Sequence, residues 1–279
     1  MVPRMKHPIT AATEGDERTW RAGDAWICAV VLIVLSLCFN ELLWSISRDS
    51  RVSANWLQSP AGTLVLRLFR TAWWLLVVFL FTRARSAREF FGRSGLSLPP
   101  NLTGWSAAWI GVAIGWLDLY GVIKGWVPQS QISSSYYSQG GAMWWSYVAY
   151  VVLLGPFYEE TVMRGFLYRA FRGSYGIVAS IFFVLCVVAY FHWGLLSRPL
   201  SFFCAVIGAV FLCVIRERTA SLWNCVLFHV AYNATVTVQW WFYVFGLLAV
   251  LPLCARATFK KAPREAVPPP SSSETPTIK

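Results

Sequence analysis

Two adjacent carboxylates, Glu159 and Glu160, lie within a long apolar part of the chain, in the run PFYEETVMRGFLYRAF. An ionised carboxylate is costly in hydrocarbon, so intramembrane acids usually face a protein interior or a water-filled cavity and serve a function. Outside the amino-terminal tail the chain has only two histidines, His192 and His229, and both lie in apolar segments. Two histidines and a glutamate pair in one half of the chain predict a shared polar site.

Helical spacing indicates that these groups can meet. Glu159 lies about 14 residues before a turn at 173–175 and His192 about 17 after it, so a rise of ~1.5 Å per residue places both at similar depth on antiparallel helices. We therefore expect Glu159 to face His192. His229 and Asn233 are one helical turn apart on a later segment, so they share a face.

Two further acids have less direct roles in this interpretation. Glu160 and Arg164 have one-turn spacing, which favours an ion pair and a supporting role for Glu160. Asp118 is a second intramembrane acid, but no titratable group stands one turn from it. We therefore do not expect Asp118 to act directly in catalysis.

The chemistry of the site is that of hydrolysis. A carboxylate in apolar surroundings is suited to taking a proton from water, and a facing histidine can orient that water. The amide of Asn233 and the imidazole of His229 can stabilise a developing oxyanion. The alternative is a zinc ion bound by His192, His229 and Glu159, because two imidazoles and a carboxylate leave an open position for water.

The rest of the chain predicts a membrane protein. Of its 279 residues, 57% are hydrophobic and only 13% are charged, which is too apolar for an ordinary soluble domain. We predict an all-α polytopic membrane protein, a bundle of about eight transmembrane helices with a buried polar site, because apolar runs recur near the ~20 residues that a span needs. The expected spans are 25–47, 63–82, 104–123, a fourth starting near 142, 175–195, 200–215, 222–238 and 239–253.

The formal charge of +11 does not indicate a nucleic-acid partner, because Lys and Arg lie between apolar segments and in the tails. They act instead as topology determinants, and they place both termini in the cytoplasm of a multi-pass protein, which we assign to a prokaryotic plasma membrane. The basic residues expected inside lie in 83–93 and 164–172, at Arg216 and Arg218, and at Lys260 and Lys261, whereas Arg48, Arg51, Lys124 and Arg198 are left outside. The seven cysteines lie in or beside apolar runs and are expected to pack as apolar residues.

The chain divides into four parts: a cytoplasmic polar tail at 1–24, amino-terminal transmembrane helices at 25–140, core helices at 141–255, and a disordered basic, Pro/Ser-rich tail at 256–279. Within the core, Gly155 and Pro156 are expected to interrupt the fourth span, since proline lacks a backbone donor and suits the first turn of a helix. Glu159 and Glu160 would then lie in the first turn of a new helix, where the dipole favours negative charge.

The core resembles the CPBP family of CAAX-endopeptidase and bacteriocin-processing intramembrane proteases. That family carries E-E-x-x-x-R, then F-x-x-x-H, then H-x-x-x-N, and the resemblance covers about Pro156 to Ala234. The matching residues are Glu159, Glu160 and Arg164 in the first motif, His192 in the second, with Val188 in place of the phenylalanine, and His229 and Asn233 in the third.

The resemblance implies an intramembrane endopeptidase with Glu159 as general base and His192 as its partner on the water. It also implies that His229 and Asn233 form the oxyanion site. Glu160 and Arg164 would shape it. We favour a metal-free glutamic mechanism without a cofactor, because Asn233 suits amide recognition better than zinc ligation. The zinc-dependent version remains the alternative.

The expected partners are the lipid bilayer and a peptide or protein substrate, cleaved near the cytoplasmic side of the membrane. The substrate class is open between a prenylated protein, a leader peptide and a carboxy-terminal sorting signal. A proton-coupled transporter is a competing hypothesis, since buried Glu and His also build proton relays, but the halves of the chain lack a clear inverted repeat. A non-catalytic membrane scaffold or immunity factor is a third.

Overall fold

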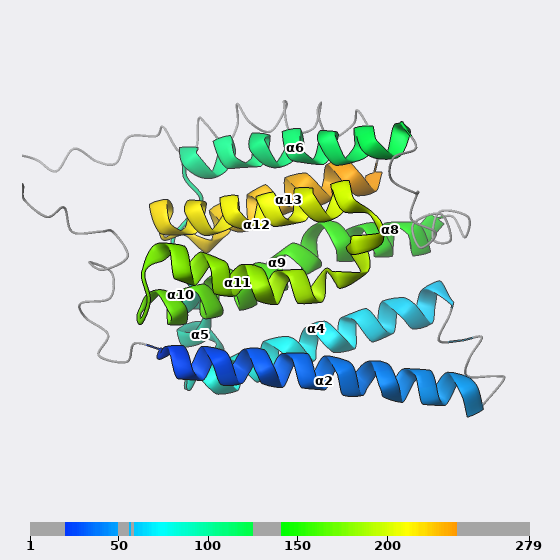
Figure 1. The fold of residues 1–279 in the computed structure, drawn as a ribbon, viewed down its shortest axis with the longest axis horizontal. Helices are drawn as coiled ribbons and strands as arrows, with labels where there is room; N and C mark the ends of the chain where they lie inside the picture. The colour runs from blue at the N-terminus through cyan, green and yellow to red at the C-terminus, as the bar shows by residue number, and fades with distance from the viewer. Residues whose placement is uncertain (1–19, 50–55, 57–58, 125–140, 239–279) are drawn as a thin grey trace, which may run out of the picture.

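A computed structural model describes residues 20–49, 56, 59–124 and 141–238, and all regular structure within these ranges is helical (Figure 1). The last expected span, 239–253, the carboxy-terminal tail and most of the amino-terminal tail lie outside the described residues. The elements are α2 (Ala22–Asp49), α4 (Pro60–Thr82), α5 (Ala87–Ser94), α6 (Leu102–Ile123), α8 (Gly141–Ala149), η1 (Tyr150–Leu154), α9 (Gly155–Glu160), η2 (Thr161–Leu167), α10 (Tyr168–Arg172), α11 (Ile177–Phe191), η3 (Trp193–Ser197), α12 (Pro199–Thr219) and α13 (Leu222–Val238).

The helices form a layered bundle. Figure 1 shows α6 along one side of the molecule and the pair α2 and α4 along the other, with α9 to α13 between them. Among the described residues, three helices are long and apolar enough to cross a membrane, at Ala22–Leu43, Pro60–Thr82 and Pro199–Thr219, and Ile177–Phe191 is a shorter apolar helix. The predicted all-helical class is confirmed, whereas the number of spans stays a prediction.

The predicted break at Gly155 and Pro156 is wrong. Gly155 keeps right-handed helical angles, φ −55° and ψ −61°, and its N–H bonds to the carbonyl of Tyr150 in the π-helix η1. Pro156 follows in the first turn of α9, so the π-helical winding passes directly into α-helix. The acid pair therefore lies in the middle of a continuous helical run from 141 to 172, and the positive end of a helix dipole does not stabilise it.

Glycines on α6 allow close packing against α13. A Cβ atom at Gly111 would collide with the Phe228 carbonyl oxygen, and one at Gly115 would lie 3.1 Å from the Tyr232 carbonyl oxygen. This G-x-x-x-G spacing is typical of helices whose backbones approach closely in membranes. The contact places the carboxy-terminal half of α6, with Asp118, beside α13.

One end of the bundle is rich in arginine, and we call it the arginine-rich end. Here α4, α10 and α12 finish and α6, α11 and α13 begin (Figure 1). Buried Arg216 connects α5 to the end of α12 by donating hydrogen bonds to the carbonyl oxygens of Ser94, at 2.9 Å, and Ala220. The linker helix α5 is thereby fixed to the junction of α12 and α13, where the N–H of Leu222 also bonds to Gly95.

Candidate active site

A cavity of about 350 Å³ lies between α4, α6, α9, α11, α12 and α13. It brings together most of the side chains that the sequence singled out, although they come from separate helices. The predicted residues that line it are Glu159, Arg164, His192, His229 and Asn233, and Glu160 lies behind them in the protein interior.

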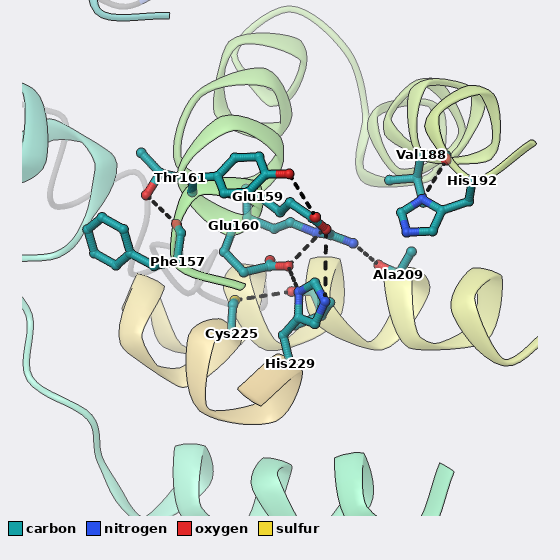
Figure 2. Close-up of polar contacts among 12 residues, drawn as sticks. Phe157, Glu159, Glu160, Thr161, Val188, His192, Ala209, Cys225 and His229 are labelled. Carbon is teal, nitrogen blue, oxygen red and sulfur yellow. Dashed lines mark hydrogen bonds and ion pairs between the residues drawn. The ribbon is translucent and has the colours of Figure 1, made fainter. Parts of the chain in front are cut away.

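Glu160 is fully buried, and its carboxylate contacts the side chains of Arg164 and His229. Its Oε1 lies 3.2 Å from a guanidinium nitrogen of Arg164 and 2.7 Å from Nδ1 of His229 (Figure 2). The ion pair predicted from one-turn spacing is therefore present. Because an ionised carboxylate only accepts, Nδ1 of His229 carries the hydrogen of this bond, and the ring is held with Nε2 on the other side.

Glu159 faces the cavity and is far less constrained. Its side chain is 27% exposed, its Oε1 accepts a hydrogen bond of 3.2 Å from the Tyr158 hydroxyl, and its Oε2 lies 3.9 Å from Nε2 of His229. The two glutamates thus stand on either side of one imidazole ring (Figure 2). Sequence neighbours on a helix point about 100° apart, so one enters the interior while the other meets the cavity.

His192 differs from its predicted position. Helix α11 ends at Phe191, and His192 follows as its cap with φ −102° and ψ 13°, rather than inside a span reaching residue 195. Its Nδ1 lies 2.9 Å from the carbonyl oxygen of Val188 on its own helix, and the imidazole recorded in contact with Glu159 is that of His229 (Figure 2). His192 and Glu159 share the cavity without a direct bond between them. Because the Val188 carbonyl only accepts, Nδ1 is the donor and Nε2 is left with a lone pair.

Asn233 is anchored by the π-helical stretch that precedes the acid pair. Its Nδ2 donates a hydrogen bond of 2.9 Å to the carbonyl oxygen of Val151 in η1. A primary amide has two N–H bonds, so this contact uses one and leaves the second for a ligand. Asn233 also lines the cavity.

Asp118, for which the sequence predicted no direct catalytic role, also lines the cavity, and its hydrogen-bond partners were not predicted. Asp118 is 3% exposed and accepts short hydrogen bonds from the hydroxyls of Ser201, at 2.6 Å, and Tyr232, at 2.7 Å. We call these three residues the Asp118 cluster. Tyr232 follows His229 by three residues on α13, so one-turn spacing could have identified it. Asp118 and Ser201 meet across 83 residues of sequence, which no local spacing indicates.

The arrangement does not fit a zinc site. Within the described residues, no group of three or more His, Cys, Asp and Glu side chains is placed to hold a metal ion. No step below therefore passes through a metal at His192, His229 and Glu159.

Residues 141–235 match the family model of type II CAAX prenyl endopeptidases, Rce1-like. This segment, about a third of the chain, is therefore similar to the CPBP family of proteases. The match runs from the start of α8 into α13 and contains all of the predicted catalytic residues. The family implies a protease, and with the apolar helices it marks an integral membrane protein. No curated protein and no solved structure matches the chain significantly.

Proposed function

We propose that this protein is a metal-free intramembrane endopeptidase of the CPBP type, in which Glu159 activates the attacking water. The observation that carries the proposal is the arrangement around His229. Its ring is fixed by buried Glu160 on one side, and partly exposed Glu159 lies on the cavity side at 3.9 Å. The family match to 141–235 supports the reaction class.

Glu159 takes a proton from water while the water oxygen attacks the scissile carbonyl carbon. The lone pair on Nε2 of His192 accepts the second hydrogen of that water and fixes its orientation. The new C–O bond converts the carbonyl oxygen into an oxyanion. Glu159 then passes its proton to the amide nitrogen, the C–N bond breaks, and the carbonyl re-forms as a carboxylic acid.

The oxyanion needs hydrogen-bond donors that are in place before the reaction. The second N–H of Asn233 is one. The other is Nε2–H of His229, since an imidazole bonded to the ionised Glu160 carboxylate can carry hydrogens on both nitrogens. Glu160 and Arg164 do not touch substrate in this scheme, and they act as positioning residues for the ring.

The test is replacement of Glu159 by Gln, which keeps the side-chain shape and removes the base. General-base catalysis contributes about 10²–10⁴-fold, so we expect turnover to fall by that factor with the fold retained. Glu41→Gln is the matched control, because Glu41 is an exposed acid on α2. Comparative proteomics of cells carrying each variant should show an uncleaved precursor only with Glu159→Gln. Undiminished processing in that variant would overturn the proposal.

A further inference from the structure

The hydroxyl of Tyr158 holds one oxygen of the proposed base. It donates a hydrogen bond of 3.2 Å to Oε1 of Glu159, although side chains one residue apart do not face each other on a helix. Both side chains line the cavity, so the bond forms there rather than along the helix surface. The other oxygen, Oε2, lies 3.9 Å from Nε2 of His229. Oε2 is therefore the oxygen left to take a proton from water.

Packing against α4 fixes the Tyr158 ring. Only 2% of the residue is exposed, and its ring meets that of Trp74 edge to face, with 5.8 Å between the centroids and 86° between the planes. In a close-packed interior a ring held in this way keeps one orientation. The Tyr158 hydroxyl therefore has a fixed position beside Glu159, and the more exposed carboxylate adjusts to it.

Arg70 places a positive charge beside this hydroxyl. It lies near the middle of α4, a helix that can cross a membrane, and an arginine at such a depth is costly and usually functional. Its side chain lines the cavity, and its charge interacts with Tyr158 and Glu159. Among the described residues no carboxylate forms an ion pair with Arg70, so no such pair accounts for this charge.

The charge of Arg70 orients the Tyr158 hydroxyl. A guanidinium carries hydrogens and no acceptor, so it attracts the lone pairs of the phenol oxygen and repels its hydrogen. The hydrogen is thereby directed away from Arg70 and toward Glu159, where the recorded bond lies. The two residues thus act in series on the same carboxylate oxygen.

We propose that Tyr158 and Arg70 are positioning residues for Glu159. Tyr158 holds Oε1 so that Oε2 meets the attacking water, and Arg70 orients the hydroxyl that holds it. The inference rests on the proposed function. Arg70 lies outside residues 141–235, so the proposal makes the amino-terminal helix α4 part of the reactive site.

Tyr158→Phe tests the first residue, because it removes the hydroxyl and keeps the ring on Trp74. The purified full-length variant is assayed on the precursor that accumulates with Glu159→Gln. Misplacing a catalytic group by about 1 Å can cost about 10²-fold, so we expect kcat to fall by about 10- to 100-fold with KM nearly unchanged. Adding Tyr158→Phe to Glu159→Gln should lower the residual rate no further, because a positioning residue has no effect without its base.

Arg70→Gln tests the second residue. We expect a smaller fall in kcat, recovery of most of it in Arg70→Lys, and no added loss when Arg70→Gln is combined with Tyr158→Phe, because Arg70 acts through the hydroxyl. Arg67→Gln is the matched control and should keep the kcat of the unmodified protein. It lies one turn earlier on α4, over the rings of Tyr147 and Tyr150, and does not line the cavity.

Gel filtration in detergent and circular dichroism check that each variant is folded. Full kcat in Tyr158→Phe, or a rise in KM as large as the fall in kcat, would overturn the role of Tyr158. Losses in Tyr158→Phe and Arg70→Gln that multiply in the double variant would overturn the role of Arg70. Normal processing by Glu159→Gln would overturn the proposed function itself, whereas an inactive Glu159→Gln beside a fully active Tyr158→Phe would overturn only the positioning.

Discussion

Two carboxylates that line one cavity, Asp118 and Glu159, differ in how fully the protein hydrogen-bonds them. Asp118 is 3% exposed and accepts two hydroxyl hydrogen bonds of 2.6 and 2.7 Å. Glu159 is 27% exposed and accepts one bond of 3.2 Å. Hydroxyl groups of the protein thus supply the hydrogen bonds that the Asp118 carboxylate accepts, whereas the Glu159 carboxylate keeps lone pairs that can accept hydrogen bonds from water. The number of hydrogen bonds that each carboxylate accepts from the protein thus distinguishes Asp118 from Glu159, the acid that we propose to be reactive.

Glu160 belongs with Asp118 in this comparison, although it is the sequence neighbour of Glu159. It is buried, and its partners Arg164 and His229 are part of the protein. Removing a buried acid that is paired within the protein should therefore cost stability, whereas removing the partly exposed Glu159 should cost activity. The four predictions below test this separation, in addition to the loss of turnover expected for Glu159→Gln.

The largest stability effect is expected from Glu160→Ala. The substitution leaves the Arg164 guanidinium buried without its carboxylate, and breaking a buried pair in this way costs about 3–5 kcal/mol. Glu159→Ala is the matched control and should change the free energy of unfolding little. Chemical unfolding in detergent, followed by circular dichroism, measures both. Equal losses in the two variants would contradict the division between the glutamates.

Tyr232→Phe should have the next largest effect. It removes the hydroxyl that donates to Asp118, and hydrogen bonds to charged groups contribute about 1.5–3 kcal/mol to stability. We expect a loss in that range, with kcat reduced much less than in Glu159→Gln. Tyr190→Phe, on α11, serves as the control. A fall in kcat as large as that of Glu159→Gln would give the Asp118 cluster a direct part in the reaction.

Gly111→Ala tests how α6 brings Asp118 to the cavity. The new methyl group would meet the Phe228 carbonyl, and overpacking of a close contact costs about 1–3 kcal/mol. Gly92→Ala in α5 is the control, because a Cβ there has nothing within 4 Å. The unfolding free energies of the two variants should therefore change in opposite directions, since alanine is the better helix former. Equal tolerance would mean that α6 does not approach α13 this closely.

Metal removal is expected to have no effect. Because the described acids and imidazoles do not form a metal-binding group, dialysis against a chelator should leave proteolysis of the accumulated precursor unchanged. Elemental analysis of the purified protein provides an independent measurement. Loss of activity on chelation, with recovery on adding zinc, would restore the zinc alternative.

Local patterns in the sequence predicted the local features correctly. Apolar runs of span length predicted the helical class, because hydrocarbon admits backbone only with its hydrogen bonds satisfied within the segment. The i, i+4 spacing of Glu160 and Arg164 predicted their ion pair, because both residues lie on one helix. Reaction of Glu159, the roles of His192, His229 and Asn233, and the boundaries of the four chain parts stay predictions.

Features set by contacts between helices were missed. The hydrogen bond from Tyr232 to Asp118 depends on the close approach of α6 to α13. The glycines of α6 allow this approach, but their spacing in the sequence does not predict a polar site there. The expected pairing of Glu159 with His192 through a water stays a prediction, since both residues line the cavity, but depth alone did not predict that His229 contacts Glu159 directly. The break expected at Pro156 did not form, because the π turns of η1 continue directly into α9, whose first turn contains this residue without a backbone donor.

The π turns also restrict how many residues this helix can contain. A π turn holds about one residue more than an α turn, so loss of a single residue from η1 would return it to α-helical winding with α8 and α9 in nearly the same rotational phase. Loss of a residue from α8 or from the start of α9 would instead rotate the glutamates by about 100° relative to α8. Either the packing of Val148 on Ala234 or the contacts of the glutamates would then be lost, because both depend on the same rotational phase. We therefore expect this helix to tolerate the loss of one residue within η1 better than an insertion or deletion elsewhere between Val148 and Glu159.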